Sequence, residues 1–266
     1  MSLMPKVGIV GLGFVGGSIK QAMEYSCSLV LIDKDPLKST HNFNELFECE
    51  GIFVCVPSPQ GEDGSCDTSI LEDVLDRLKD YKGVIISKCT APPAVYEKLN
   101  AQYPNLVHAP EFLTAANANI DYINGKFLFV GGSVGAYIRD AERIIRMGQC
   151  NLTEVIHCTI KEASLAKYTI NSFLATKVTF MNEIYFLAKE FGADYDKIAK
   201  MVSLDPRIGS SHLKVPGLDG SFGFGGMCFP KDTSALLKYA ENHSVQLNVL
   251  ESAVKKNTLL RLTEPK

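Results

Sequence analysis

The fold of this chain is indicated first by residues 6–16, which read KVGIVGLGFVG. Residues 6–10 form a short apolar run typical of a buried strand, and a helical pattern begins at Phe14. Glycines spaced G-x-G-x-x-G between a strand and a helix permit a tight turn, and they let backbone N–H groups approach a pyrophosphate at the positive end of the helix. This context favours a dinucleotide site over a purely structural glycine turn. The predicted cofactor-binding residues of the turn are Gly11, Gly13, Phe14, Val15 and Gly16.

An acidic residue follows where a dinucleotide site needs one. Asp33 lies at the end of the second predicted strand, residues 29–33. A carboxylate in this place accepts hydrogen bonds from the ribose 2′-hydroxyl and repels a 2′-phosphate. The predicted cofactor is therefore NAD rather than NADP, although the neighbouring Lys34 weakens the repulsion.

Short β-branched runs alternate with helical patterns along the first 157 residues. The predicted strands are 6–10, 29–33, 52–57, 84–89, 106–109, 127–131 and 155–158, and the predicted helices are 14–24, 69–78, 94–100 and 134–147. Strands separated by helices are typical of βαβ units, which build a parallel sheet covered on both faces. We therefore predict an α/β fold, with a Rossmann-type, doubly wound parallel sheet in an NAD-binding domain of residues 1–157.

The sequence pattern changes after this domain. Residues 162–191 contain neither Pro nor Gly and carry apolar side chains at helical spacing, which predicts one helix about 45 Å long. This length is unusual for a globular domain, and burial on two sides in a dimer core would explain it. Further helices are predicted at 194–203, 233–241 and 248–262, with a loop at 205–227. Residues 158–266 are thus expected to form an all-helical domain that makes a homodimer through its long helix.

Composition excludes several classes of protein. The 266 residues carry 27 Lys and Arg against 30 Asp and Glu, a formal net charge of −3, which offers no basic surface for nucleic acid or an anionic membrane. No apolar run of about 18 residues is present, so no membrane-spanning helix is expected. The eight cysteines form no C-x-x-C pair and no Cys/His cluster, which predicts no metal site. Scattered thiols and the lack of a signal pattern indicate a reducing cytoplasm.

A second glycine-rich stretch, residues 223–232, reads GFGGMCFPKD. Its glycines let backbone come close to a ligand or to another backbone segment. Cys228 lies just before a predicted helix, with Pro230 in the first turn and Lys231 nearby, and this position favours the thiolate, the nucleophilic form of cysteine. Asp232, four residues on, would share a helix face with Cys228 and could orient water or accept a proton. The alternative is a buried structural cysteine with an acid at the helix start.

The long predicted helix carries a polar stripe. Lys167 and Asn171 are spaced i, i+4, and Asn182 returns to nearly the same face three turns later. A buried lysine beside a reacting centre can stabilise a developing oxyanion or act as a base. A solvated stripe would show the same spacing, and the neighbouring residues do not decide between the two. The other helix lysines, Lys161, Lys177 and Lys189, are expected on the surface.

Over about residues 5–260 the chain resembles the nucleotide-sugar dehydrogenases, the family of UDP-glucose, GDP-mannose and UDP-N-acetylmannosamine dehydrogenases. Residues 56–59 (VPSP) with Asp67 and Ser69 look like the family's V-P-T-P and D-x-S, and residues 88–90 (KCT) are similar to its K-S-T. Residues 110–113 are similar to its P-E-F-L motif, and 166–183 look like its central helix. Residues 223–232 match its G-F-G-G-x-C-x-x-K-D loop.

The resemblance implies an enzyme of polysaccharide biosynthesis that oxidises the primary alcohol of a nucleotide sugar to a carboxylate with two NAD. This four-electron reaction would be that of a UDP-glucose 6-dehydrogenase or a close relative. Cys228 would add to the aldehyde and form a thiohemiacetal, which is oxidised to a thioester and then hydrolysed. Lys167 and Asn171 would stabilise the alkoxide and the tetrahedral oxyanions.

The resemblance also implies roles for residues outside the cysteine loop. Asp232 and Thr90 would hold and polarise water, and Glu111 would activate it as an acid or base. Further cofactor contacts are implied for Val56, Pro57, Thr90 and Lys231. Substrate contacts are implied for Phe112, Leu113, Arg207, Phe222, Gly223 and Gly225. Arg207 would reach the sugar bound in the neighbouring subunit of the dimer.

The chain departs from the family pattern at several places. Ala115 replaces a second glutamate, Cys89 replaces a serine, and the segment between Asp33 and Ile52 is short. The family's third, nucleotide-gripping domain has no counterpart within these 266 residues. One rival hypothesis is a two-electron β-hydroxyacid dehydrogenase, a class that shares the first domain and a Lys-x-x-x-Asn helix but has no cysteine nucleophile. The other is a non-catalytic protein that binds NAD.

Overall fold

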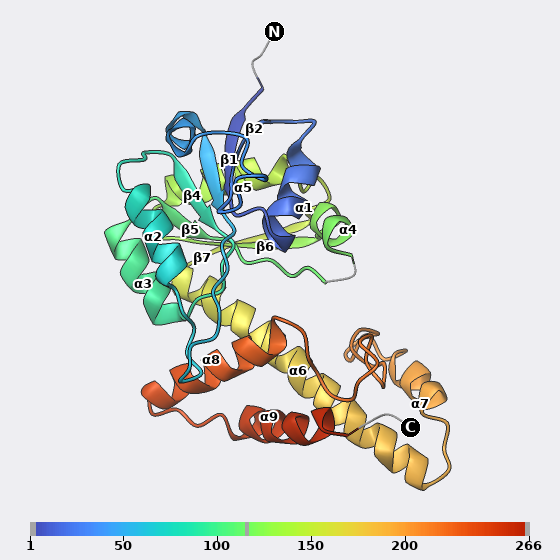
Figure 1. Cartoon of the computed structure of the whole chain (residues 1–266). Coiled ribbons are helices and arrows are strands. Elements are labelled where there is room, and N and C mark those ends of the chain that lie inside the picture. Colours follow the sequence, from blue (N-terminus) through green and yellow to red (C-terminus); the bar gives the residue numbers. More distant parts are fainter. Residues whose placement is uncertain (1–3, 115–116, 264–266) are drawn as a thin grey trace. The chain divides into compact units, whose positions relative to one another are not determined.

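A computed structural model describes residues 4–114 and 117–263 of the chain (Figure 1). These residues form two compact units. Unit 1 comprises Met1–Pro59 and Cys66–Lys167, and unit 2 comprises Gln60–Ser65 and Tyr168–Lys266. The short segment Gln60–Ser65 thus packs with the second half of the chain although it follows an early strand. The predicted domain boundary after residue 157 stays a prediction.

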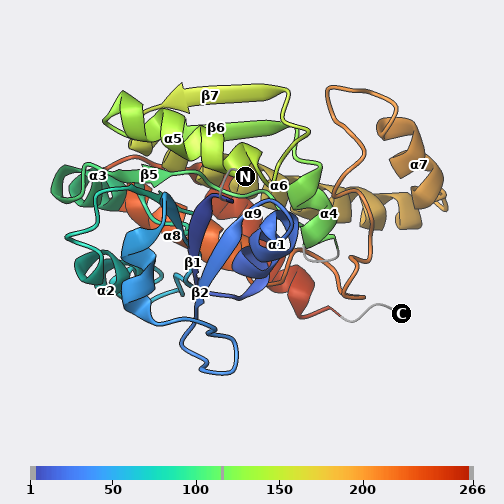
Figure 2. The ribbon, with the colours of Figure 1, turned by 90° about the horizontal axis from the view of Figure 1, so that it is seen from above.

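Unit 1 is built on a seven-stranded sheet within the described residues. The strands are β1 (Lys6–Val10), β2 (Ser28–Ile32), β3 (Gly51–Val54), β4 (Val84–Ser87), β5 (Leu106–His108), β6 (Phe127–Gly131) and β7 (Glu154–Cys158). Their order is β2-β1-β3-β4-β5-β6-β7, and Figure 2 follows the sheet from β7 and β6 at the top of the view to β1 and β2 below. The predicted α/β fold with a doubly wound sheet is confirmed, but the sheet is mostly rather than wholly parallel, because β5 and β6 pair antiparallel.

Helices cover both faces of this sheet, as two separate hydrophobic cores show. The helices α1 (Phe14–Met23), α4 (Ala118–Ile123) and α5 (Gly135–Arg146) pack over one face. The other face is covered by α2 (Ser69–Arg77), α3 (Pro93–Gln102) and the 3₁₀ helix η1 (Phe43–Glu48). Every residue of β3 and β4 is buried, which explains why these strands are continuous apolar runs rather than alternating ones.

Two short elements of unit 1 were not predicted. Both η1 and α4 are six residues long, too short for an apolar stripe to repeat. The η1 helix begins with a capping box between Asn42 and Glu45, in which each residue bonds to the backbone of the other. The strand β3 is also shorter than the predicted residues 52–57, since it covers only Gly51–Val54.

Unit 2 is helical. The helix α6 (Ile160–Glu190) is 31 residues long and continues from unit 1 into unit 2, so the predicted long helix is confirmed. It is followed by α7 (Tyr195–Val202), α8 (Phe229–Asn242) and α9 (Asn248–Arg261). The core between them contains Met181, Tyr195, Leu213, Phe222 and Leu260. The helix α8 begins four residues before the predicted start because Pro230 lies in the first turn, where its missing N–H costs nothing.

Two further findings hold for the described part of the chain. Among the residues that the structure describes, no disulfide joins any of the eight cysteines. Within the same residues, no helix combines the length and the apolar character that crossing a bilayer would require.

Candidate functional site

The glycine turn after β1 has the close backbone contacts that its pattern predicts. Gly11 has a φ of +90°, and a Cβ there would lie 2.7 Å from the carbonyl oxygen of Cys55. A Cβ on Gly16 would lie 1.9 Å from the carbonyl oxygen of Gly11, so helix α1 can start this close to the turn only with glycine. A Cβ on Gly13, the N-cap of α1, would meet no atom within 4 Å. The backbone at Gly13 is therefore open to a ligand.

The carboxylate of Asp33 is held against this turn. Its Oδ2 accepts the backbone N–H of Leu12 at 2.5 Å, and its Oδ1 accepts that of Asp35 at 2.9 Å. Partial burial raises the pKa of Asp33, but these two N–H donors together with Lys38 and Lys34 outweigh it, so the pKa lies below its ordinary value. Asp33 is therefore ionised at neutral pH, as a contact with a ribose hydroxyl requires.

The predicted cofactor and catalytic residues of unit 1 follow strands that are neighbours in the sheet. Asp33 follows β2, Gly11 follows β1, Val56 follows β3, Thr90 follows β4 and Glu111 follows β5. These five strands are parallel, so their carboxyl ends lie at one edge of the sheet, where ligands bind in doubly wound folds. Pro57, next to Val56, is exposed in the segment beyond β3.

A buried ion pair lies at this edge. The Lys167 ammonium donates to the carbonyl oxygen of Glu111 and lies 3.5 Å from its Oε1. The side chains of Lys167 and Glu111 are 5% and 12% exposed. The Oε2 of Glu111 accepts the N–H of Leu113 at 2.7 Å, and the Lys167 Nζ lies 5.0 Å from the ring centre of Phe112. Lys167, Glu111, Phe112 and Leu113 are thus brought together, and the polar position on the long helix is buried rather than a solvated stripe.

A second buried cation is Lys88, the first residue of the motif at 88–90, for which the sequence predicted no role. Its residue is 5% exposed, and its Nζ lies 6.0 Å from the ring centre of Tyr122. Burial lowers the pKa of Lys88 to about 8, against the opposing effects of Cys55 and Glu111. The signal that could have found it is its position in an apolar strand run, where a lysine is rare.

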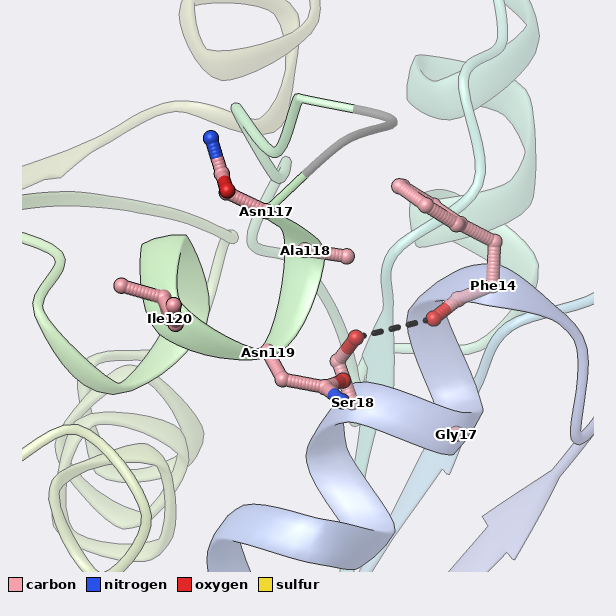
Figure 3. A pocket seen from close by; sticks show the side chains of 7 residues that line it. All are labelled: Phe14, Gly17, Ser18, Asn117, Ala118, Asn119 and Ile120. Atoms are coloured by element: carbon pink, nitrogen blue, oxygen red, sulfur yellow. Dashed lines mark hydrogen bonds between the residues drawn. The ribbon is translucent and has the colours of Figure 1, made fainter.

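A cavity of about 510 Å³ opens beside the first turn of α1. It is lined by Phe14, Gly17, Ser18, Asn117, Ala118, Asn119 and Ile120. Figure 3 shows the Asn119 side chain near Ser18, whose hydroxyl donates to the Phe14 carbonyl at 3.0 Å. Phe14 is the predicted cofactor residue that lines this cavity. Ala115, which replaces the family glutamate, lies outside the described residues.

Unit 2 places Cys228 at the N-cap of α8, exposed, as predicted for a reactive cysteine rather than a buried structural one. The Asp232 N–H donates to the Cys228 carbonyl at 2.9 Å, which puts both residues on one turn of the helix. Asp232 is 1% exposed, and its two oxygens accept from Asn171 Nδ2 at 2.6 Å and from Lys231 Nζ at 2.5 Å. Asn171 and Lys231 therefore both bond to one buried carboxylate, while the Lys231 side chain itself stays 23% exposed.

The remaining predicted substrate residues of unit 2 lie in the loop before α8. The ring of Phe222 packs in the core, 4.9 Å from the ring centre of Phe186, so its side chain is a core residue. Gly223 has a φ of +72°, and the guanidinium of Arg261 packs against Gly225. Asn182, predicted on the same polar stripe as Asn171, bonds instead to the N–H of Gly223 at 3.0 Å.

Arg207 is highly exposed, with an 87% exposed side chain, and is held by two bonds to Asp205 at 3.0 and 2.6 Å. Lys177 fixes the turn that follows, since its Nζ donates to the carbonyls of Ile208 and Gly209 at 2.9 and 3.3 Å. Lys177, expected on the surface, is partly exposed there and also bonds to these carbonyls. Sequence spacing gives no sign of this contact, which joins residues more than 30 positions apart.

The residues present fit NAD. The open backbone at Gly13, the N-terminus of α1 and the ionised Asp33 would hold a pyrophosphate and a ribose. Among the described residues no group of His, Cys, Asp and Glu could hold a metal ion. The sheet order, the glycine turn and its acid place the chain in the class of dinucleotide-binding α/β proteins.

Comparison with known proteins narrows this class. Residues 31–147 match the NAD-binding domain, and residues 161–259 the central domain, of the UDP-glucose/GDP-mannose dehydrogenase family. The chain belongs to this family, and the predicted resemblance and the predicted cofactor, NAD, are confirmed. It is 32% identical over 240 residues to a UDP-glucose 6-dehydrogenase of Rickettsia felis, covering 85% of this chain and 52% of that protein. The chain thus spans about half the length of the curated relatives it matches.

Solved structures show the same fold. A UDP-glucose dehydrogenase from Pyrobaculum islandicum superposes with a TM-score of 0.80 at 24% identity, over 97% of this chain and 69% of that one. A 3-hydroxyisobutyrate dehydrogenase from Mycobacterium tuberculosis superposes with a TM-score of 0.75 at 15% identity, over 95% and 92% of the two chains. The fold alone is therefore shared by a nucleotide-sugar dehydrogenase and by a hydroxyacid dehydrogenase.

Proposed function

We propose that this chain oxidises the C6 alcohol of a nucleotide sugar, UDP-glucose or a close relative, to the uronic acid. The balanced reaction consumes one alcohol, two NAD⁺ and one water, and yields one carboxylate, two NADH and three protons. NAD, when bound, supplies the hydride acceptor for both oxidation steps. The proposal rests on the family membership of the chain and on the chemistry of its own residues.

In the proposed reaction, Cys228 forms the covalent intermediates with the substrate. Its sulfur adds to the aldehyde carbon, the aldehyde oxygen takes up a proton, and a thiohemiacetal results. Loss of a hydride from this carbon and of the proton from its hydroxyl gives a thioester, and water then displaces the sulfur as a thiolate, leaving the carboxylate. The Asp232 carboxylate, which accepts hydrogen bonds from Asn171 and Lys231, lies on the same helical turn as Cys228 and would orient that water.

In the proposed reaction, Lys167 supplies the positive charge that stabilises negatively charged oxygen. Its ammonium is already desolvated and fixed by Glu111, so it can stabilise an alkoxide or an oxyanion without further ordering. Glu111, whose side chain lies beside that of Lys167, would exchange protons with water. Thr90 at the end of β4 would polarise the same water, and Phe112 and Leu113 would bind the sugar.

The single observation that carries this proposal over its rival is Cys228 exposed at the N-terminus of α8. A hydroxyacid dehydrogenase, which transfers two electrons, would leave this cysteine and its buried acid without a use. The fold cannot discriminate, because both kinds of enzyme superpose on this chain.

The test is a count of NADH per substrate consumed. Purified protein is mixed with NAD and a limiting amount of UDP-glucose, UDP-N-acetylmannosamine or GDP-mannose, and absorbance is read at 340 nm. Two NADH per sugar support the proposal, and one NADH supports the two-electron rival. If the protein binds NAD but forms no NADH with any of the three nucleotide sugars, the non-catalytic, NAD-binding hypothesis is supported instead. In Cys228→Ser, acid production should be abolished, and unchanged turnover would rule out covalent catalysis.

We further infer a cytoplasmic homodimer that pairs through α6. This helix exposes Phe173, Phe180 and Leu187 at a spacing of seven residues, with 69%, 57% and 53% of their surfaces open to solvent. Large apolar side chains repeated every two turns form a seam typical of helix pairing. Light scattering after size exclusion should give twice the chain mass of 29.1 kDa, and Phe180→Glu should halve it. A wild-type monomer would contradict the inference, and with it the proposed reach of Arg207 into a neighbouring subunit.

A further inference from the structure

The loop that leads to Cys228 is held by two asparagines from different helices of unit 2. Asn182 on α6 accepts the N–H of Gly223 with its Oδ1 at 3.0 Å. Asn257 on α9 accepts the N–H of Phe224 with its Oδ1 at 2.7 Å, and its Nδ2 donates to the Phe224 carbonyl at 3.0 Å. Two successive backbone N–H groups of the loop are therefore satisfied by side chains far away in the sequence.

Both asparagine side chains are buried, so their hydrogen bonds stabilise the conformation of the loop. Asn182 is 1% exposed and Asn257 is 8% exposed. Asn182 also donates to the carbonyl of Val178 at 2.8 Å, which fixes its side chain on its own helix. A buried backbone group that loses its partner destabilises its conformation strongly, because water cannot replace the bond. These bonds tie residues 223–224 of the loop to α6 and α9.

The loop packs closely against Asn257 and the following turn of α9. Gly223 has a φ of +72°, and a Cβ there would lie 2.3 Å from the Oδ1 of Asn257. Next along α9, Arg261 packs its guanidinium against Gly225 and forms an ion pair with Asp219 at 2.7 Å. One face of α9 therefore contacts the loop from residue 219 to residue 225.

The position of the loop is transmitted to the cysteine through an aromatic contact. Asn257 bonds to both the N–H and the carbonyl of Phe224. The ring of Phe224 contacts the ring of Phe229 edge-on, with ring centres 6.2 Å apart. Phe229 is the first residue of α8 and directly follows Cys228, the N-cap. Displacement of Phe224 would therefore move the start of α8 and the sulfur with it.

We propose that Asn257, with Asn182, is a positioning residue for Cys228, acting through the backbone of Gly223–Phe224 and the Phe224–Phe229 contact. The inference deepens the proposed function and rests on it for the catalytic consequence. The geometric consequence, a change in the reactivity of the Cys228 thiol, does not require that the enzyme turns over a sugar. The two consequences can therefore be measured separately.

The first experiment measures the thiol. Asn257→Leu has nearly the same side-chain volume but leaves the N–H and carbonyl of Phe224 without partners. Iodoacetamide labelling of Cys228 in the full chain is followed by mass spectrometry of its peptide. We expect labelling about two- to fivefold slower than in wild type, because the sulfur loses its place at the helix N-terminus. Asn257→Asp, which keeps the acceptor for the Phe224 N–H but loses the donor to its carbonyl, should also be slowed.

Two controls separate positioning from lost stability. Leu250→Ala removes a buried side chain of α9 that makes no hydrogen bond to the loop, so it lowers stability without touching Phe224. Thr258→Ala changes the residue next to Asn257 at an exposed position. Both should label at the wild-type rate. Equal slowing in Asn257→Leu and Leu250→Ala, or wild-type labelling in Asn257→Leu, would overturn the inference.

The second experiment measures turnover. We expect kcat for NADH formation about 10²-fold lower in Asn257→Leu, with the KM for NAD within twofold of wild type, because the glycine turn and Asp33 lie in unit 1, away from Asn257 in the sequence and in its hydrogen bonds. If Asn257→Leu does not fold, Asn182→Leu removes the bond to Gly223 and serves the same two measurements. No NADH from any variant or from wild type would count against the proposed function alone, since the labelling rates would still decide the positioning role. A KM for NAD that rises as much as kcat falls would contradict the positioning role of Asn257.

Discussion

Replacing Lys88 by Met should make the protein more stable at neutral pH. Lys88 is 5% exposed and lies beneath the ring of Tyr122, in a segment that follows the fully buried β4. Burial opposes its positive charge and lowers its pKa from 10.5 to about 8. Methionine has a similar length, no charge and a flexible chain that fills the same space.

The expected gain follows from the two pKa values. In the unfolded chain Lys88 binds its proton with a pKa of 10.5, and in the folded protein with a pKa of about 8. At about 1.4 kcal/mol for each tenfold change in proton affinity, keeping the charge in the folded state costs about 3 kcal/mol. The unfolded state binds more protons between pH 8 and pH 10.5, so wild-type stability rises with pH across this window. Below pH 8 the cost is present in full, and above pH 10.5 it is gone.

The free energy of unfolding of wild type and Lys88→Met is measured by urea denaturation at pH 7, 9 and 10.5. The chain contains no tryptophan, so far-ultraviolet circular dichroism follows the transition, and hydrogen exchange of the β4 amides reports on unit 1. The variant should be more stable by about 3 kcal/mol at pH 7, and the difference should vanish toward pH 10.5. Lys82→Met, at an exposed position, should show no difference at any pH. A Lys88→Met protein that is less stable than wild type at pH 7, or whose gain is the same at all three pH values, would refute the reasoning.

Three further predictions concern the proposed site. Gly16→Ala would place a Cβ 1.9 Å from the carbonyl oxygen of Gly11 and should abolish NAD binding in calorimetry. The control is Gly17→Ala, whose Cβ would meet no atom within 4 Å. This variant should bind NAD normally, and its free energy of unfolding should rise by about 0.5–1 kcal/mol. Asp33→Ser should weaken NAD by about tenfold or more and reduce the preference over NADP, and unchanged affinity in titration would show that its carboxylate does not bind the ribose. Lys167→Ala should lower kcat on the order of 10²–10³-fold in the NADH assay, and a loss confined to KM would argue against an oxyanion role.

The elements that local patterns specify were predictable from the sequence. The strand–turn–helix at the start of unit 1 was recognised because the glycine spacing, the apolar run before it and the helix after it are contiguous. The long helix α6 was recognised for the same reason, since 31 residues give many repeats of an apolar pattern. Cys228 could be placed at a helix start because Pro230 marks a first turn.

Only the tertiary structure decided the rest, because the deciding contacts join distant residues. The elements η1 and α4 are too short for a periodic signal, and packing of the chain around the sheet stabilises them. The pairing of Lys167 with Glu111, and of Asn171 with Asp232, each spans more than 50 positions. Asn257 was an ordinary polar residue on a predicted helix until the structure placed it against the backbone of Phe224. A buried amide that satisfies a distant backbone leaves no periodicity in the sequence, so folding alone determines which loop it holds.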